Sequence, residues 1–207
     1  MARACERAPA GGRRVSVCAS CGSGVGAADR FCAQWTRDST YVDLRVSAAN
    51  ILARDALERE AMVEALALAR EVLNGQSISG EQIETAFGLS IKAAIALGDE
   101  TAITELEAFV AGRTKARATP LLRAGRARLQ AELAYRRGEP DACWRFEEEA
   151  IRLPVAVGAR PLLARTLAER GRHHGDADAL GESQSIYEEL GASRWLERID
   201  SGSEVAA

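Results

Sequence analysis

The 207-residue sequence predicts an all-α fold in which antiparallel helix pairs stack into a solenoid, preceded by a small cysteine-containing segment. After residue 47, apolar residues recur at steps of three and four, as one buried face of an α-helix requires. Glycine followed by an acidic residue recurs at positions 98, 138 and 175, at intervals of 40 and 37 residues. This interval is typical of a helix pair. Because one pair cannot bury both of its faces alone, consecutive pairs are expected to stack.

Composition supports small-residue helix packing and excludes several classes of protein. Hydrophobic residues make up 47% of the chain but aromatic residues only 5%, and the formal net charge is −3. The acidic balance disfavours a general attraction to nucleic acid. No apolar run reaches the length of a membrane span, and the start of the chain lacks the apolar core of a secretory signal. We therefore expect a cytoplasmic protein that contacts no membrane.

Three cysteines near the start have metal-type spacing. Residues 1–16 are rich in Arg, Ala, Pro and Gly and predict a disordered tail. Cys18 and Cys21 are two residues apart and Cys32 follows, a pattern in which paired thiolates bind one Zn²⁺. A closed zinc site needs a fourth ligand, for which Cys5 is available. The alternatives are a decayed, poorly ordered segment and, less favoured, a redox pair.

The helices are expected between identifiable start and stop signals. Residues 36–46 are predicted to link the cysteine segment to a repeat domain over 47–200, with a disordered tail over 201–207. The predicted helices span 47–74, 80–97, 100–112, 120–138, 140–154, 161–172, 183–190 and 193–199.

Each boundary has a local cause. Ser47 is an expected N-cap and Gly75 follows the end of the first helix. Gly98 ends the second, and Pro120 suits the first turn of the fourth. Pro154 is expected to end or kink the fifth. The final helix contains Trp195 and Leu196 and is expected to close the array.

Two family resemblances agree with this organisation. Residues 127–154 resemble a tetratricopeptide repeat, with small side chains at Ala131, Cys143 and Ala150 and a turn at Gly138. TPLLRA at 119–124, AYRRGEPDA at 134–142, IYEELGA at 186–192 and WLER at 195–198 resemble the C-terminal helical-repeat region of large bacterial class III adenylate/guanylate cyclase proteins that also carry an AAA-type ATPase. Such a resemblance, over roughly 60–200, implies a tetratricopeptide-like fold.

Some members of that family begin with a zinc ribbon, which the segment over 17–35 resembles. The family's fourth cysteine lies three positions after the third, where this chain has Trp35. The chain is too short to include the cyclase and ATPase domains, so the resemblance implies neither activity.

Other polar residues are interpreted as structural. His173 and His174 are expected to be exposed at a helix end, and the acidic run over 147–149 to be a solvated face. Cys143 is expected to be a small core residue. The basic stretch is interpreted as solvated surface; its members are Arg113, Lys115, Arg117, Arg123, Arg126 and Arg128.

The sequence therefore predicts a non-catalytic protein, because no nucleophile, base and orienting group can be assembled from it. The leading hypothesis is a scaffold that binds a protein or peptide in a groove of helical repeats. One alternative is a nucleic-acid-associated regulator that uses the ribbon and the basic stretch. Another is a shortened relic of a cyclase-ATPase regulator.

Overall fold

The computed structural model describes residues 26–37, 39–75, 80–114 and 118–200, and in this part of the chain all regular structure is helical. The predicted all-α class is therefore confirmed. The helices are α1 (Ala27–Thr36), α2 (Val42–Glu58), α3 (Met62–Asn74), α4 (Gly80–Leu97), α5 (Glu100–Ala111), α6 (Pro120–Arg136), α7 (Pro140–Val157), α8 (Arg160–His174), α9 (Ala177–Glu189) and α10 (Ser193–Asp200). None of these helices is long and apolar enough to cross a membrane.

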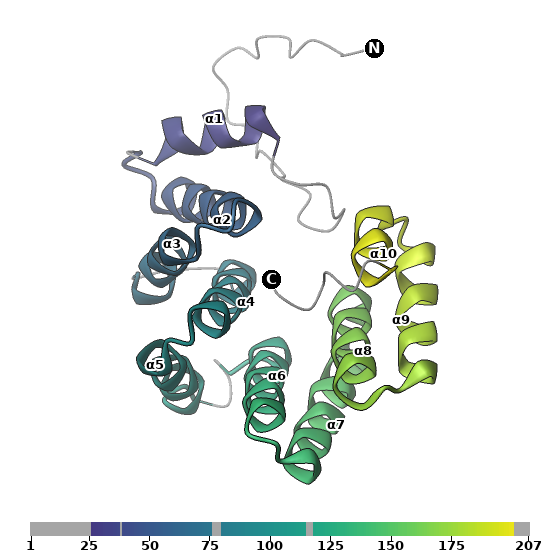
Figure 1. Ribbon diagram of the computed structural model, residues 1–207. Coiled ribbons are helices and arrows are strands. Elements are labelled where there is room, and N and C mark those ends of the chain that lie inside the picture. The colour runs from purple at the N-terminus through teal and green to yellow at the C-terminus, as the bar shows by residue number, and fades with distance from the viewer. Residues whose placement is uncertain (1–25, 38, 76–79, 115–117, 201–207) are drawn as a thin grey trace.

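The helices follow one another around an arc (Figure 1). Helices α2, α4, α6 and α8 lie on its inner side, and α3, α5, α7 and α9 lie on its outer side. Successive helices pack against each other, and α4 also packs against both α2 and α6. Helix α1 covers α2 at one end, while α10 covers α9 at the other. The final helix therefore lies at the end of the succession of helices and packs on α9.

Glycines end several helices in one recurring backbone motif. Gly98, Gly138 and Gly175, the predicted turning points, adopt positive φ angles of 64°, 70° and 66°. After Gly98, the amide of Asp99 donates to the carbonyl of Ala94 at 3.1 Å, and Gly98 itself donates to Ile95 at 3.2 Å. This pair of bonds is a Schellman motif, which satisfies carbonyls at the helix end. The same bonds recur at the glycines at 138, 158 and 191.

The predicted single helix over 47–74 is wrong, because the chain forms α2 and α3 instead. The break is also a Schellman motif: Glu60 donates to Leu57 at 3.1 Å, and Ala61 donates to Ala56 at 2.8 Å. Glu60 stands where the other breaks have glycine, and its φ is 60°. Since no glycine marks the turn, the sequence gives no stop signal there. Ser47, the expected N-cap, lies inside α2, because this helix already begins at Val42.

Replacing Glu60 by Gly is expected to raise the free energy of unfolding by about 1 kcal/mol. A residue with a Cβ is disfavoured in the left-handed region by about 1–2 kcal/mol, and the greater freedom of glycine in the unfolded chain offsets part of that gain. Urea denaturation followed by circular dichroism measures the change. The matched control is Gly138→Ala, which introduces the same strain and should lower stability by a similar amount. A Glu60→Gly variant no more stable than the natural chain would contradict this interpretation.

The other helix boundaries agree with the predicted ones to different degrees. Helix α4 has the predicted bounds, and α7 continues through Pro154 to Val157. Helix α9 starts at Ala177, six residues before the predicted start. Its N-cap is Asp176, whose side chain accepts a hydrogen bond from the amide of Ala179 at 3.0 Å. This cap directly follows Gly175, the residue with positive φ that ends α8, so the two helices meet with almost no loop.

The largest core cluster lies between helices α1 to α6. Phe87 of α4 is its largest fully buried side chain, and its ring stacks on Phe109 of α5 with centroids 5.9 Å apart. Gly125 of α6 lies so close that a Cβ there would be 3.0 Å from the Phe87 ring. A separate cluster under α8, α9 and α10 includes Tyr187, whose ring stacks on Trp195 at 5.7 Å. Aromatic side chains such as Phe87 and Tyr187 are therefore buried where neighbouring helices pack.

Helix α1 and the start of α2 lie in the part of the chain that was predicted to precede the helical domain. Residues 27–35, the second half of the predicted ribbon-like segment, belong to α1. Helix α2 begins at Val42, inside the predicted linker over 36–46. The N-terminal and C-terminal tails, over 1–16 and 201–207, lie outside the described residues.

Candidate functional site

The predicted cysteine site is only partly within the described residues. Cys32 lies on α1 and is exposed. Cys5, Cys18 and Cys21 lie outside the described residues, so the zinc site on the N-terminal cysteines stays a prediction.

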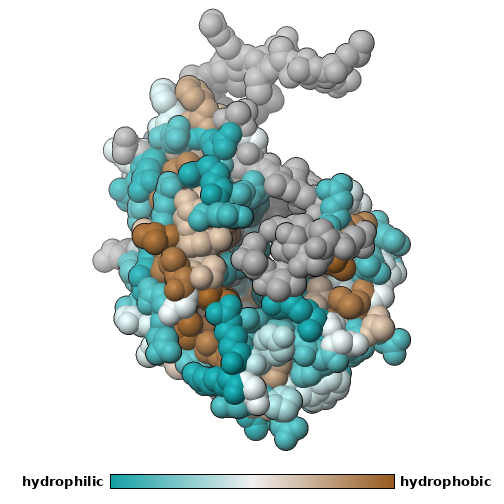
Figure 2. All heavy atoms as spheres, viewed as in Figure 1, coloured by the Kyte–Doolittle hydropathy of each residue, from teal (hydrophilic) through white to brown (hydrophobic). Residues whose placement is uncertain are grey.

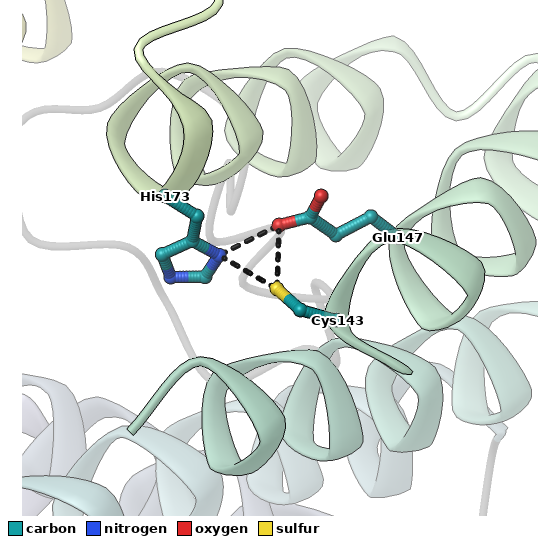
Figure 3. Close-up of side chains that lie close together, drawn as sticks. All are labelled: Cys143, Glu147 and His173. Atoms are coloured by element: carbon teal, nitrogen blue, oxygen red, sulfur yellow. Dashed lines mark hydrogen bonds and ion pairs between the residues drawn. The ribbon is translucent and has the colours of Figure 1, made fainter. Parts of the chain in front are cut away.

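A different group of metal-ligating side chains meets between α7 and α8. Cys143 and Glu147 are one turn apart on α7, and both point toward His173 near the end of α8 (Figure 3). Cys143 Sγ is 3.4 Å from Glu147 Oε1 and 3.6 Å from His173 Nδ1. His173 Nδ1 is 2.6 Å from the same Glu147 oxygen. We call these three residues the Cys-Glu-His cluster.

A second layer of polar side chains surrounds the cluster. Glu132 of α6 lies with Oε2 at 3.0 Å from His173 Nε2, so each nitrogen of that ring faces a carboxylate. Arg136 and Arg172 both donate to Glu132, each at 2.9 Å. His174 Nε2 is 2.8 Å from Glu147 Oε2. The network therefore joins α6, α7 and α8.

Aromatic rings cover this network. The Tyr135 ring stacks on His173 with centroids 4.2 Å apart. The Trp144 ring meets His174 edge-on at 5.0 Å, and the Arg170 guanidinium lies 3.6 Å from the centre of the same indole. Apolar rings reduce the access of water to the polar groups beneath them, which strengthens the electrostatic interactions there.

Burial and charge set the protonation of the cluster. Burial alone would raise the pKa of Glu132, but hydrogen bonds from His173 and Arg136 and the charge of Arg172 outweigh it and lower the pKa to about 2. Burial likewise opposes the charged form of His173, yet its contacts with Glu132 and Glu147 raise its pKa. For the Cys143 thiol, burial and then the neighbouring Glu147 charge raise the pKa to about 12.

These pKa shifts indicate which chemistry the cluster supports. A thiol with so high a pKa stays protonated near neutral pH, so Cys143 is not an activated nucleophile. The cluster instead presents sulfur, nitrogen and oxygen donors to one point, as a metal site does. Cys143 itself is fully buried, as predicted.

Two predictions about these residues are wrong. The side chain of His173 is only 2% exposed, although a solvated helix end was expected for it and for His174. Glu147 is buried too, whereas its neighbour Glu148 is on the predicted exposed face. The helix end was identified correctly, but Tyr135 and Glu132 of α6 contact the His173 ring there and help to enclose it. The one-turn spacing between Cys143 and Glu147 was the feature of the sequence that could have indicated that Glu147 shares the buried face of Cys143.

The basic stretch is also not uniformly solvated. Arg128 is buried in α6 and makes two hydrogen bonds to Glu169 of α8. Arg123 pairs with Glu149 at 3.6 Å, while the Arg113 guanidinium lies 4.1 Å from the centre of the Phe109 ring. Lys115 and Arg117 lie outside the described residues. Part of the stretch therefore holds the helices together.

Large apolar side chains are exposed at the start of the array. On α1, Phe31 and Trp35 are 69% and 82% exposed, and their spacing of four residues places them on one face. Tyr41, Val42 and Leu44 are exposed at the start of α2, against which α1 packs. We call these five residues the N-terminal aromatic surface.

Comparisons with protein-family models, with curated proteins and with solved structures give no match to this chain.

Proposed function

We propose that the chain is a non-catalytic scaffold of tetratricopeptide-like helix pairs that binds a protein partner. The observation that carries this proposal is the N-terminal aromatic surface, where Trp35 is 82% exposed. Tryptophan and tyrosine are enriched among the residues that dominate binding energy at protein interfaces. Exposed aromatic residues in a chain with so few of them mark a surface for another molecule.

Contacts between successive helix pairs support the repeat organisation. Side chains that join one pair to the next recur at similar separations in the first half of the chain. Asn50 bonds to Gln82 across 32 residues, and Arg70 bonds to Glu105 across 35. These separations are close to the 34-residue period of tetratricopeptide repeats. In the second half the corresponding bond, from Arg128 to Glu169, spans 41 residues.

The inner side of the arc is a less favourable place for the partner. The Lys92 ammonium of α4 lies 5.2 Å from the ring centre of Trp195 of α10, so a side chain of α4 reaches a helix far from it in the sequence. This contact covers part of the surface that the scaffold hypothesis assigned to a peptide. We therefore place the partner on the N-terminal aromatic surface.

The capture of partner proteins from an extract of the source cells tests this assignment. We expect the natural chain to retain one or more proteins that a Phe31→Ser/Trp35→Ser double variant loses. The matched control is Val63→Ser on α3, where the side chain is 71% exposed. Figure 2 shows apolar side chains gathered over α3 and α5 on the left of the view. The Val63→Ser variant therefore also tests whether the partner binds at this second apolar surface.

Two outcomes decide against the proposal. If the double variant retains the same proteins as the natural chain, the N-terminal aromatic surface is not the binding site. If the natural chain retains nucleic acid, and salt releases it, the nucleic-acid alternative is favoured instead.

A further inference from the structure

We infer that Cys143, Glu147 and His173 form a binding site for one divalent transition metal ion of the zinc type. The inference is independent of the proposed partner surface, which lies on α1 and α2. It also differs from the predicted zinc site, because it uses none of the N-terminal cysteines.

The distances between the donor atoms fit tetrahedral coordination. Zinc binds sulfur at about 2.3 Å and nitrogen or carboxylate oxygen at about 2.0–2.2 Å, so neighbouring ligands of a tetrahedral ion are roughly 3.3–3.6 Å apart. Sγ of Cys143 is 3.4 Å from Glu147 Oε1 and 3.6 Å from His173 Nδ1. The remaining separation, 2.6 Å between Nδ1 and Oε1, is a hydrogen bond. It must lengthen by about 0.7 Å to admit the ion.

The charges of the ligands match a divalent ion. Arg136 and Arg172 already pair with Glu132, which leaves the Glu147 carboxylate and the Cys143 sulfur facing the ion. A coordinating thiol loses its proton, so these two ligands supply two negative charges. Binding releases that proton, and any proton on His173 Nδ1, to solvent. A mixed set of thiolate, imidazole and carboxylate favours zinc or cobalt over magnesium and calcium, which prefer oxygen ligands alone.

The surroundings resemble the second layer of established zinc sites. A histidine that binds a metal through one nitrogen usually donates its other N–H to a carboxylate, which fixes the orientation of the ring. Glu132 Oε2 is 3.0 Å from His173 Nε2 and is held by two arginines. His174 bonds to the second oxygen of Glu147 and is partly exposed. A water molecule is expected to complete the coordination.

Cobalt binding to the full chain tests the site without changing any residue in it. The variant Cys5→Ser/Cys18→Ser/Cys21→Ser/Cys32→Ser leaves Cys143 as the one cysteine, since the chain has five. We expect one Co²⁺ per chain, a near-ultraviolet charge-transfer band from cysteine sulfur, and the intense visible bands of a tetrahedral ion. Zinc should displace the cobalt and remove both sets of bands.

Further variants are made in the same four-serine chain. Cys143→Ser should abolish the charge-transfer band, and Glu132→Gln should weaken cobalt binding by about 10- to 100-fold. The matched control is Glu169→Gln, which removes a partly buried carboxylate outside the cluster and should bind cobalt like its parent. Circular dichroism establishes whether each variant is folded.

No cobalt bound to the folded four-serine chain, or cobalt bound without a sulfur band, would overturn the inference. Equal cobalt affinity in the folded Glu132→Gln variant would overturn the assignment of Glu132 to the second layer. If Cys143→Ser fails to fold, the decision rests on the spectrum of its parent, in which no other cysteine can contribute the band.

Discussion

Replacing Phe87 by Ala is expected to lower the free energy of unfolding by about 3–5 kcal/mol. Its ring is fully buried between α4, α5 and α6, where it touches Phe109 and the position of Gly125. Truncation removes these contacts and leaves a cavity. Helix α6 cannot easily move to fill this cavity, because it also packs against α5 and α7. Chemical denaturation of the purified chain measures the loss.

The control for this prediction is the same substitution at an exposed site. Phe31→Ala should change the free energy of unfolding by about 0.5 kcal/mol or less, since the Phe31 side chain is mostly exposed. Similar losses in the two variants would show that Phe87 does not occupy a tightly packed core.

Replacing Arg128 by Ala is expected to have an effect of similar size, about 3–5 kcal/mol, for a different reason. The Arg128 and Glu169 side chains are 6% and 25% exposed, and they join α6 to α8. Removal of the arginine leaves a largely buried carboxylate without its main partner, which costs far more than the loss of an exposed pair. The matched control is Arg123→Ala, which breaks an exposed pair and should cost no more than about 1 kcal/mol.

The same ion pair predicts how stability depends on acid. Burial opposes the charge of Glu169, but Arg128, followed by Arg165 and Arg172, lowers its pKa from 4.5 to about 2. A lowered pKa in the folded chain gives stability that is present above pH 4.5 and is lost as pH falls toward 2. Denaturation at a series of pH values should show this loss. In the Glu169→Gln variant, the free energy of unfolding that is lost over this pH range should be smaller by about 2–3 kcal/mol. If the variant and the natural chain lost the same free energy, Glu169 would not be the group responsible for this acid dependence.

The sequence predicted most of the helix boundaries that local chemistry marks, although it placed the start of α9 six residues too late. Gly98 and Gly138 are needed for positive φ, and each is followed by the start of the next helix, so the pairs were identifiable. The turn at Glu60 was missed because the chain accepts a strained residue there, and packing of α2 against α3 overrides the local preference. Periodicity alone cannot distinguish one long helix from two helices joined so tightly.

The polar cluster was missed because it depends on contacts between distant residues. His173, Glu147 and Glu132 come from three helices, and a single sequence gives no indication that these faces meet. Each residue on its own fits a solvated helix surface, which is where such residues usually lie. Cys143 was correctly assigned to the core, but its neighbours were not.

The scaffold function is tested most directly by photo-crosslinking in the source cells. A photoreactive amino acid is placed at position 35, on the N-terminal aromatic surface, and in a second chain at position 63 on α3. Both positions are largely exposed, so only a bound partner should distinguish them. We predict discrete protein adducts from position 35 that are absent from position 63. Adducts of equal yield from both positions, or none from position 35, would contradict the assignment of this surface to a protein partner.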